Sequence, residues 1–140
     1  MKLRRRKDRS RGGAMVEMAL LIPIFTMFVF GQIEASRAGM VAQLLTNAAR
    51  EGARVAAMPD TMDSSAVTSR VNQVLSGSGI SVGTVTPTCP SPYAWQSAPG
   101  GTPITVSLSV PYSQVSWLGT PYFLNGTVVS ASATLSSENP

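Results

Sequence analysis

The sequence predicts an α+β protein, in which a long N-terminal transmembrane helix extends into a small exported domain with one short helix and an antiparallel sheet of about three strands. Residues 14–33, AMVEMALLIPIFTMFVFGQI, carry no charge except that of Glu17. No proline lies between Pro23 and Pro59, so nothing stops this helix before residue 58. Segments that alternate apolar and polar residues, as half-buried strands do, occur in the C-terminal half.

Four consecutive parts of the chain are expected. At about 1.5 Å per residue, a helix over residues 14–33 is about 30 Å long, the thickness of the hydrocarbon core of a bilayer. We expect a basic leader at 1–12 that is removed, a transmembrane helix at 13–33, an extramembrane continuation of this helix at 34–58 and a small α+β exported domain at 59–140. A chain of 140 residues has no room for a second folded domain.

The charges are divided unevenly along the chain. Before Gly13 there are seven Lys and Arg and one Asp, a net charge of +6, and from Gly13 onward four Arg and six Asp and Glu, a net charge of −2. The formal total of +4 therefore does not indicate a nucleic-acid partner. Lys and Arg beside a span stay in the cytoplasm, so we expect a single-pass membrane protein with its N-terminus inside and its C-terminal domain outside.

Three other interpretations of the first part of the chain are open. A cleaved secretory signal peptide has a shorter apolar stretch and an A-x-A site, and Ser36-Arg37-Ala38 is the nearest approach to such a site. A twin-arginine export signal is suggested by Arg4 to Arg6, although the surrounding residues do not match it. A plain uncleaved signal anchor explains the basic residues and the span but leaves Glu17 unexplained.

Glu17 and the two glycines before the span indicate proteolytic processing. A carboxylate deep in a bilayer costs about 2.5 kcal/mol or more, and such residues are usually paired or functional. Gly12 and Gly13 either give a stretch without side chains that a protease can draw into an extended conformation, or merely break the helix. A cut between them would create an α-ammonium at Gly13, close in depth to Glu17, the fifth residue of the mature chain. Charge pairing between neighbouring chains would then neutralise both groups.

A basic leader, a glycine and an apolar helix with Glu at the fifth mature position resemble the type IV prepilins, which a membrane aspartyl prepilin peptidase cuts after that glycine. More specifically, RGGAMVEMALLIP and LLTNAAREGARVAA (Leu44 to Ala57) are similar to the TadE-like family, the minor pseudopilins of tight-adherence (Tad/Flp) pilus systems. Its members show R-G-x-x-x-V-E-F-A-L-x-x-P and, about thirty residues on, T-N-A-A-R-E-G-A-R. The resemblance covers residues 9–57, with Met18 where the family usually has Phe or Tyr.

The resemblance implies a non-enzymatic protein that is processed by the prepilin peptidase and helps to initiate or assemble a pilus. Gly12 and Gly13 are then the scissile pair, with Gly13-Ala14 as the alternative cut, and Glu17 sets the register between subunits. The implied partners are the prepilin peptidase, other pilins and pseudopilins, the inner-membrane assembly platform and membrane lipid. The alternative function is an uncleaved signal-anchored envelope protein whose outer domain is a binding module.

The long helix is expected to change its partners along its length. Pro23 leaves the carbonyl of Ala19 without a helical donor and favours a kink. The small residues Gly31, Ala35 and Gly39 recur every four positions, as in helices that approach other helices closely, and Ala38 and Ala42 form a parallel row. Beyond them an apolar stripe faces the protein's own domain, and Glu51 is three residues from Arg54, with which it can pair; the stripe consists of Val41, Leu44 or Leu45, Ala48, Gly52 and Val55.

The exported domain shows one helical and three strand patterns. After Met58-Pro59-Asp60, one of the residues 63–65 caps a short helix over Ser65–Leu75, with Val67, Val71, Val74 and Leu75 on one face. Ser76-Gly77-Ser78-Gly79 ends this helix. The predicted strands are Ile80–Thr86, Ile104–Val110 and Thr127–Ser136, and Asn125-Gly126 predicts a tight hairpin turn into the last of them.

The two long loops carry aromatic residues that are candidates for contact with a partner. Residues 87–103 contain five prolines together with Tyr93 and Trp95, which either form a contact surface or cover the edge of the sheet. The second loop contains Trp117, Leu118, Tyr122 and Phe123. We take Trp95 and Trp117 as the candidate partner contacts. Cys89 is the single cysteine, so no disulfide within the chain is possible.

The residues that enzymes and metal sites need are scarce in this sequence. It has no histidine, and Asp60 and Asp63, three residues apart at a helix start, are better suited to capping than to catalysis. We therefore expect no catalytic residues, no metal and no cofactor.

Overall fold

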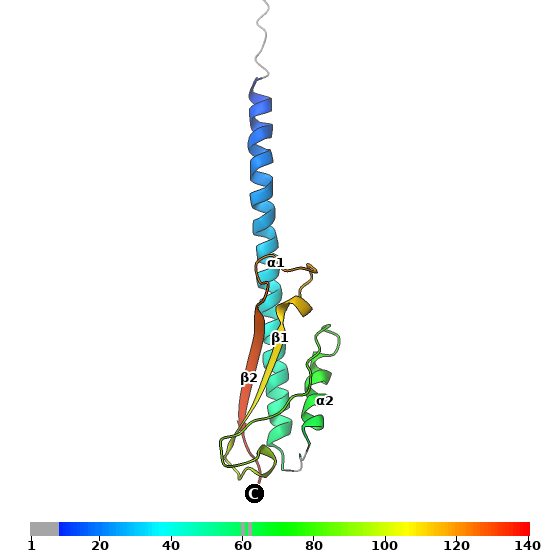
Figure 1. Cartoon of the computed structure of the whole chain (residues 1–140), viewed down its shortest axis with the longest axis vertical. Coiled ribbons are helices and arrows are strands. Elements are labelled where there is room, and N and C mark those ends of the chain that lie inside the picture. The colour runs from blue at the N-terminus through cyan, green and yellow to red at the C-terminus, as the bar shows by residue number, and fades with distance from the viewer. Residues whose placement is uncertain (1–8, 60, 62) are drawn as a thin grey trace, which may run out of the picture. The chain divides into compact units, whose positions relative to one another are not determined.

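The computed structural model describes residues 9–59, 61 and 63–140 (Figure 1). It contains helix α1 (Arg9–Ala57), helix α2 (Ser64–Leu75), 3-10 helix η1 (Trp95–Ser97), strand β1 (Pro103–Pro111), 3-10 helix η2 (Tyr112–Gln114) and strand β2 (Val128–Ser136). The chain divides into two compact units, Met1–Ile33 and Glu34–Pro140. The predicted α+β class is confirmed, but the sheet of the described residues has two strands instead of about three.

Helix α1 begins earlier than the expected start of the span at Gly12-Gly13. Residues 9–13 are already helical, and residues 1–8 lie outside the described part. The reason is the cooperativity of helices, because each residue added to an existing helix gains a hydrogen bond without a new nucleation cost. The two glycines weaken this end of the helix but do not interrupt it.

In the second unit, one side of α1 forms a wall of the hydrophobic core. Val41, Leu45 and Ala48 are completely buried, whereas Arg50 and Arg54 are exposed. The predicted apolar stripe is therefore confirmed, and alanines at neighbouring helical positions widen it; these are Ala49, Ala53 and Ala56.

Helix α2 packs its apolar side against the same core. Val67, Val71 and Leu75 are buried, as predicted, and Val74 is partly buried against them. Asp63 is the N-cap, because its carboxylate accepts hydrogen bonds from the hydroxyl and the backbone N–H of Ser65. These bonds from Ser65 hold the pKa of Asp63 below its ordinary value.

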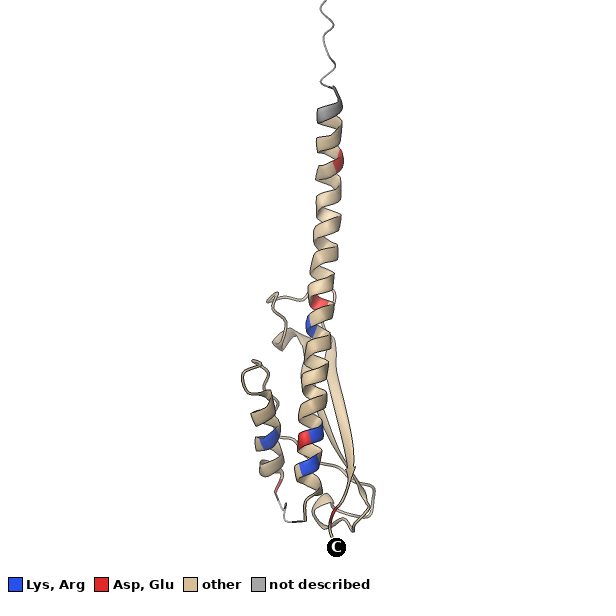
Figure 2. Ribbon diagram, turned by 180° about the vertical axis from the view of Figure 1, so that it is seen from behind, with Lys and Arg blue, Asp and Glu red and all other residues tan. Residues whose placement is uncertain are grey.

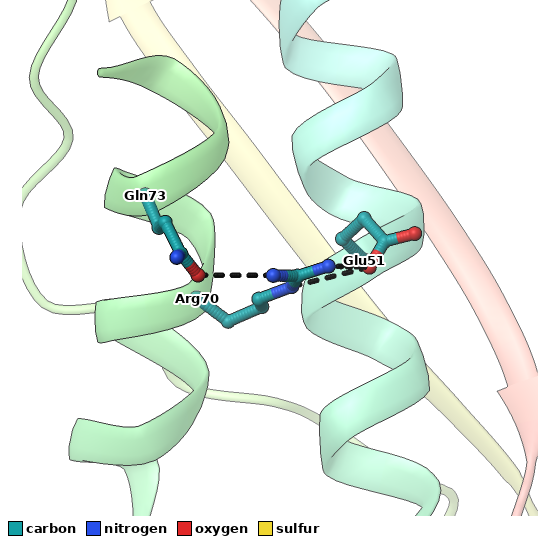
Figure 3. A network of polar contacts seen from close by, with 3 residues as sticks. All are labelled: Glu51, Arg70 and Gln73. Carbon is teal, nitrogen blue, oxygen red and sulfur yellow. Dashed lines mark hydrogen bonds and ion pairs between the residues drawn. The ribbon is translucent and has the colours of Figure 1, made fainter.

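An ion pair joins α1 to α2, and it differs from the predicted one. Nε and Nη2 of Arg70 lie 3.1 and 2.6 Å from Oε2 of Glu51, while Nη1 donates to Gln73 at 2.9 Å (Figure 3). The expected pairing of Glu51 with Arg54 is thus replaced by a contact between helices. The planar guanidinium of Arg70 binds one carboxylate oxygen of Glu51 with two donors. The side chains are 41% and 35% exposed, so the pair contributes little to stability.

Strands β1 and β2 form an antiparallel ladder in which Pro103 pairs with Ser136 and Pro111 with Val128. The alternation predicted for Ile104–Val110 is confirmed, since every second residue of β1 is buried; the buried residues are Ile104, Val106, Leu108 and Val110. In Figure 1 the two strands run alongside the part of α1 that belongs to this unit.

The strand predicted at Ile80–Thr86 does not form. The backbone N–H of Val85 donates to the hydroxyl of Thr68 on α2, at 3.1 Å, and an isolated bridge to β1 forms only after this segment, between Thr88 and Thr105. Gly83 interrupts its alternation and Pro87 lacks a donor, so a continuous ladder is unfavourable here. Ile80 and Val85 are nevertheless buried, so the segment contributes side chains to the core without being a strand.

The connection between the strands is longer than a tight hairpin. Residues 112–127 join β1 to β2, and Asn125-Gly126 forms a turn only at the end of this loop. The N–H of Thr127 donates to the carbonyl of Leu124 at 3.2 Å, and Gly126 has a φ of 76°, which favours glycine. The predicted turn is present, but it does not join paired strands directly.

Helix α1 packs very closely against both α2 and β1 at Gly52. A Cβ placed on Gly52 would lie 2.7 Å from Cγ2 of Val71 and 3.4 Å from Cγ1 of Val106. Only glycine therefore fits without a shift of its neighbours. Gly39, on the same helix, has no such neighbour within 4 Å.

We expect Gly52→Ala to destabilise the domain and Gly39→Ala to stabilise it slightly. Either change improves helix propensity by about 1 kcal/mol, but only the first adds an overpacking cost of about 1–3 kcal/mol. Urea unfolding of the full chain in detergent, followed by the fluorescence of buried Trp95, measures both effects. Equal shifts for the two variants would contradict the packing argument.

Candidate functional site

The predicted scissile pair lies in the first turns of α1. Gly12 and Gly13 are helical and exposed, and among the described residues no side chain or neighbouring segment lies within 4 Å of a Cβ placed on either. The first N–H groups of any helix lack intrahelical acceptors, and glycine lowers the stability of this turn further. The site is therefore accessible, although a protease that needs an extended substrate must first unwind it.

The residues after the glycines are exposed and apolar on all sides of the helix. Large side chains such as Met15, Leu20 and Phe25 are 75%, 67% and 67% exposed. By length and composition the helix is long and apolar enough to cross a membrane. Figure 2 shows how sparse charged residues are along α1. A helix that is apolar all round needs lipid or other helices as its surroundings, which fits single-pass anchoring.

Glu17 is the single charged residue between Gly12 and Ile33, and it is exposed. Among the described residues the ion pair is that of Glu51 with Arg70, and Glu17 takes no part in it. Its predicted role in subunit register stays a prediction.

Helix α1 continues through Pro23 without interruption, and the hydroxyl of Thr26 donates to the carbonyl of Ile22 at 2.8 Å.

The small residues Gly31, Ala35 and Gly39 recur along one face of α1. Ala35 and Gly39 are exposed, so the protein's own domain does not cover them. The face continues into an open hollow of about 390 Å³, which is lined by Ala42, Gln43, Thr46, Asn47 and Arg50. The role of this face in helix packing stays a prediction.

The sequence did not identify Glu34 as a structural residue, yet it is only 1% exposed. Its Oε1 accepts the backbone N–H of Tyr122 at 2.6 Å, and its Oε2 accepts those of Phe123 and Leu124, each at 3.0 Å. Its backbone carbonyl accepts the hydroxyl of Tyr112 at 3.0 Å. One residue of α1 thus fixes the long loop of residues 112–127 at both of its ends.

Arg37, one turn further along α1, fixes the middle of the same loop. It is 7% exposed, and its Nε donates to the carbonyl of Val115 at 2.8 Å. Its guanidinium carbon lies 4.8 Å from the centre of the Trp117 ring, within the range of a cation–π contact. One signal for both anchors was present in the sequence, because Glu34 and Arg37 are charged residues three positions apart among small and apolar residues. The loop that they bind is 78–90 residues away, so no local pattern identified it.

The two tryptophans that were predicted as partner contacts differ in exposure. Trp95 is 7% exposed and belongs to the hydrophobic core, so it does not provide a contact surface. Its indole is buried among apolar side chains, where it is more stable than in water. Trp117 is 65% exposed, so it stays available as a contact residue.

Cys89 is a free, partly buried cysteine whose thiol donates to the carbonyl of Tyr93 at 2.8 Å.

We expect Glu34→Ala to release the end of the loop that precedes β2. The backbone N–H groups of Tyr122, Phe123 and Leu124 lose a charged acceptor, so they should exchange with solvent about tenfold faster or more. Hydrogen exchange of the full chain in detergent measures this effect, with Glu51→Ala as a control that removes another carboxylate of α1. The same protection of these amides in both variants would contradict the anchoring role.

We expect the domain to lose stability at alkaline pH through Tyr112. Burial raises the pKa of its phenol, and the nearby Glu34 raises it further, against the opposing effects of Ser116 and Arg37. Above about pH 10 the unfolded chain loses this proton before the folded one does, so stability is complete below that pH and falls above it. Tyr112→Phe should remove this fall while losing about 1 kcal/mol for one hydrogen bond.

Urea unfolding at a series of pH values between about 8 and 11 tests this expectation. Tyr93→Phe is the matched control, because Tyr93 is 49% exposed and lies in the other loop. An unchanged alkaline loss in the Tyr112→Phe variant would assign it to another group.

One comparison with known proteins bears on this N-terminal segment. The family model described as TadE-like protein matches residues 12–54, which include Gly12, Glu17, the small-residue face and both loop anchors, Glu34 and Arg37. Neither a curated protein nor a solved structure matches the chain. The resemblance predicted from the sequence is therefore confirmed for residues 12–54, which are similar to the TadE-like family.

Proposed function

We propose that this protein is a minor pseudopilin that assists the initiation or assembly of a tight-adherence (Flp type IVb) pilus. The match of residues 12–54 to the TadE-like family carries the proposal, because it supports a component associated with such a pilus. The apolar first part of α1 is consistent with anchoring in a membrane. The work of the protein is then mechanical assembly, without catalysis of its own.

In this proposal a prepilin peptidase removes residues 1–12 by cutting between Gly12 and Gly13. The exposure of both glycines and their place in the first turns of α1 support this step. The cut leaves the α-ammonium of Gly13 one helical turn from Glu17, since four residues separate them. In the bilayer, a carboxylate and an ammonium from neighbouring chains stabilise each other and fix the relative height of two subunits.

The proposed contacts with other pilins and pseudopilins lie on the small-residue face of α1. Ala35 and Gly39 are exposed, and an approaching helix would meet no side chain at Gly39. Such a surface allows close contact between helix backbones. Pro23 would provide a weak point where the helix bends as it leaves the bilayer for a filament. Gly31 continues the face into the proposed span, residues 13–33.

The proposed location is the inner membrane of a bacterium, with the N-terminus inside and residues 34–140 outside. The net charge of +6 before Gly13 supports this orientation, because Lys and Arg beside a span stay in the cytoplasm. Besides the peptidase and the other subunits, the proposed partners are the inner-membrane assembly platform and the lipid around the span.

We expect the mature N-terminus to be Gly13 in cells that contain the peptidase, and the leader to be intact in cells that lack it. Intact-mass measurement and N-terminal sequencing of the protein from membranes test this. An intact leader in the native host would overturn the processing step and favour the uncleaved binding module. A mature N-terminus at Ala14 would instead identify Gly13-Ala14 as the scissile bond.

The role of Glu17 is tested separately, because processing does not require it in this proposal. We expect Glu17→Ala to be processed normally but to reduce piliation strongly, with Glu17→Asp retaining most of it because the charge is kept. Pilus counts by electron microscopy measure both variants. Normal piliation of the Glu17→Ala strain would contradict the register role.

A further inference from the structure

We propose that the loop of residues 112–127 is a membrane-contact element, which inserts Trp117 and Phe123 into the lipid headgroup layer of the outer leaflet of the inner membrane. The inference goes beyond the proposed function. It rests on the proposed span at residues 13–33, but it depends neither on processing nor on pilus assembly.

The first argument is that the loop exposes large aromatic rings although other residues of the same loop are packed in the hydrophobic core. Tyr112 and Val115 are 1% and 4% exposed and belong to the core. Trp117, Tyr122 and Phe123 are 65%, 73% and 54% exposed. Three large aromatic side chains exposed on one loop are more than scattered surface residues, and such clusters mark contacts with proteins or membranes.

The second argument is that the backbone of the loop is fixed. Four hydrogen bonds involve Glu34, three to its carboxylate and one to its carbonyl, and a fifth joins Arg37 to the carbonyl of Val115. The guanidinium of Arg37 also supports one side of the Trp117 ring, at 4.8 Å. The rings are therefore held outward by the fold and do not reflect a loop that failed to pack.

The third argument identifies the lipid headgroup layer as the surroundings of these rings. Glu34 follows Ile33, the last residue of the proposed span, so it lies about 1.5 Å further along the helix axis. The headgroup layer extends about 5–7 Å beyond the hydrocarbon core on each side. Backbone groups bound to the carboxylate of Glu34 are thus carried at the depth of that layer, by chain connectivity alone.

The chemistry of the rings fits this layer better than water or hydrocarbon. Trp and Tyr are enriched where membrane meets water, because each has an apolar body and a polar group. Residues 112–127 carry no charged side chain, so the loop meets no charge penalty at the membrane surface.

The test uses the full chain reconstituted in phosphatidylcholine vesicles, with some of the lipid brominated near the headgroup end of its acyl chains. We expect the lipid bromines to quench tryptophan emission in the wild type and this quenching to be lost in Trp117→Phe. In that variant the remaining emission comes from Trp95, which is buried in the core and serves as an internal reference. We also expect Phe123→Ala to reduce the quenching, whereas Tyr93→Ala, which removes an exposed ring from the other loop, should leave it unchanged.

Flotation of the vesicles after an alkaline wash shows separately whether the span has inserted. If the chain floats but Trp117 is quenched by aqueous iodide and not by the lipid bromines, the membrane contact is overturned while the span stands. If the chain does not float, the span and this inference fall together. Protection of Trp117 from iodide that appears only when other pilus subunits are added would also overturn the membrane contact. It would favour a contact between subunits.

Discussion

Helix α1 is held in the second unit by close packing against α2 and β1, and the other contacts of the domain depend on this arrangement. At Gly52 the backbone of α1 comes so near to Val71 and Val106 that a methyl group would not fit without a shift. Alanines at neighbouring positions allow the same close approach on either side. Small side chains reduce the apolar area that each residue buries, but they let both partners contact one helix, so the core is built around it.

The same helix has to satisfy two different surroundings. Its first part exposes Met, Leu, Ile and Phe side chains and has one charge, whereas its second part carries polar residues opposite a buried stripe. Glu34 and Arg37 stand where one composition gives way to the other, and both side chains are used to hold the loop of residues 112–127. A buried carboxylate is stable there because three N–H groups replace the water that it has lost.

These features connect the fold to the proposed function. A subunit that is pulled from a bilayer into a filament needs one continuous helix, a folded domain that does not cover every face of that helix, and a way to set its height in the membrane. The exposed face at Ala35 and Gly39 and the charge of Glu17 correspond to the second and third of these needs. The match to the TadE-like family includes Glu17, Ala35 and Gly39.

The sequence by itself determined the elements that depend on local patterns. The apolar run predicted the first part of α1, the absence of proline its continuation, and the spacing of apolar residues both the buried stripe and α2. Strict alternation predicted β1 to within one residue at each end. These patterns can be recognised in a sequence because each helix or strand buries one face. The spacing of the buried residues is set by the backbone geometry of that element.

Only the tertiary structure decided which distant segments meet. The partner of Glu51 is Arg70 and not Arg54, residues 80–86 satisfy part of their backbone at Thr68 instead of forming a strand, and Trp95 lies in the core. The role of Glu34 depends on N–H groups 88–90 residues away. No local period encodes these contacts, because they follow from how the segments pack together and from the need of every buried polar group for a partner.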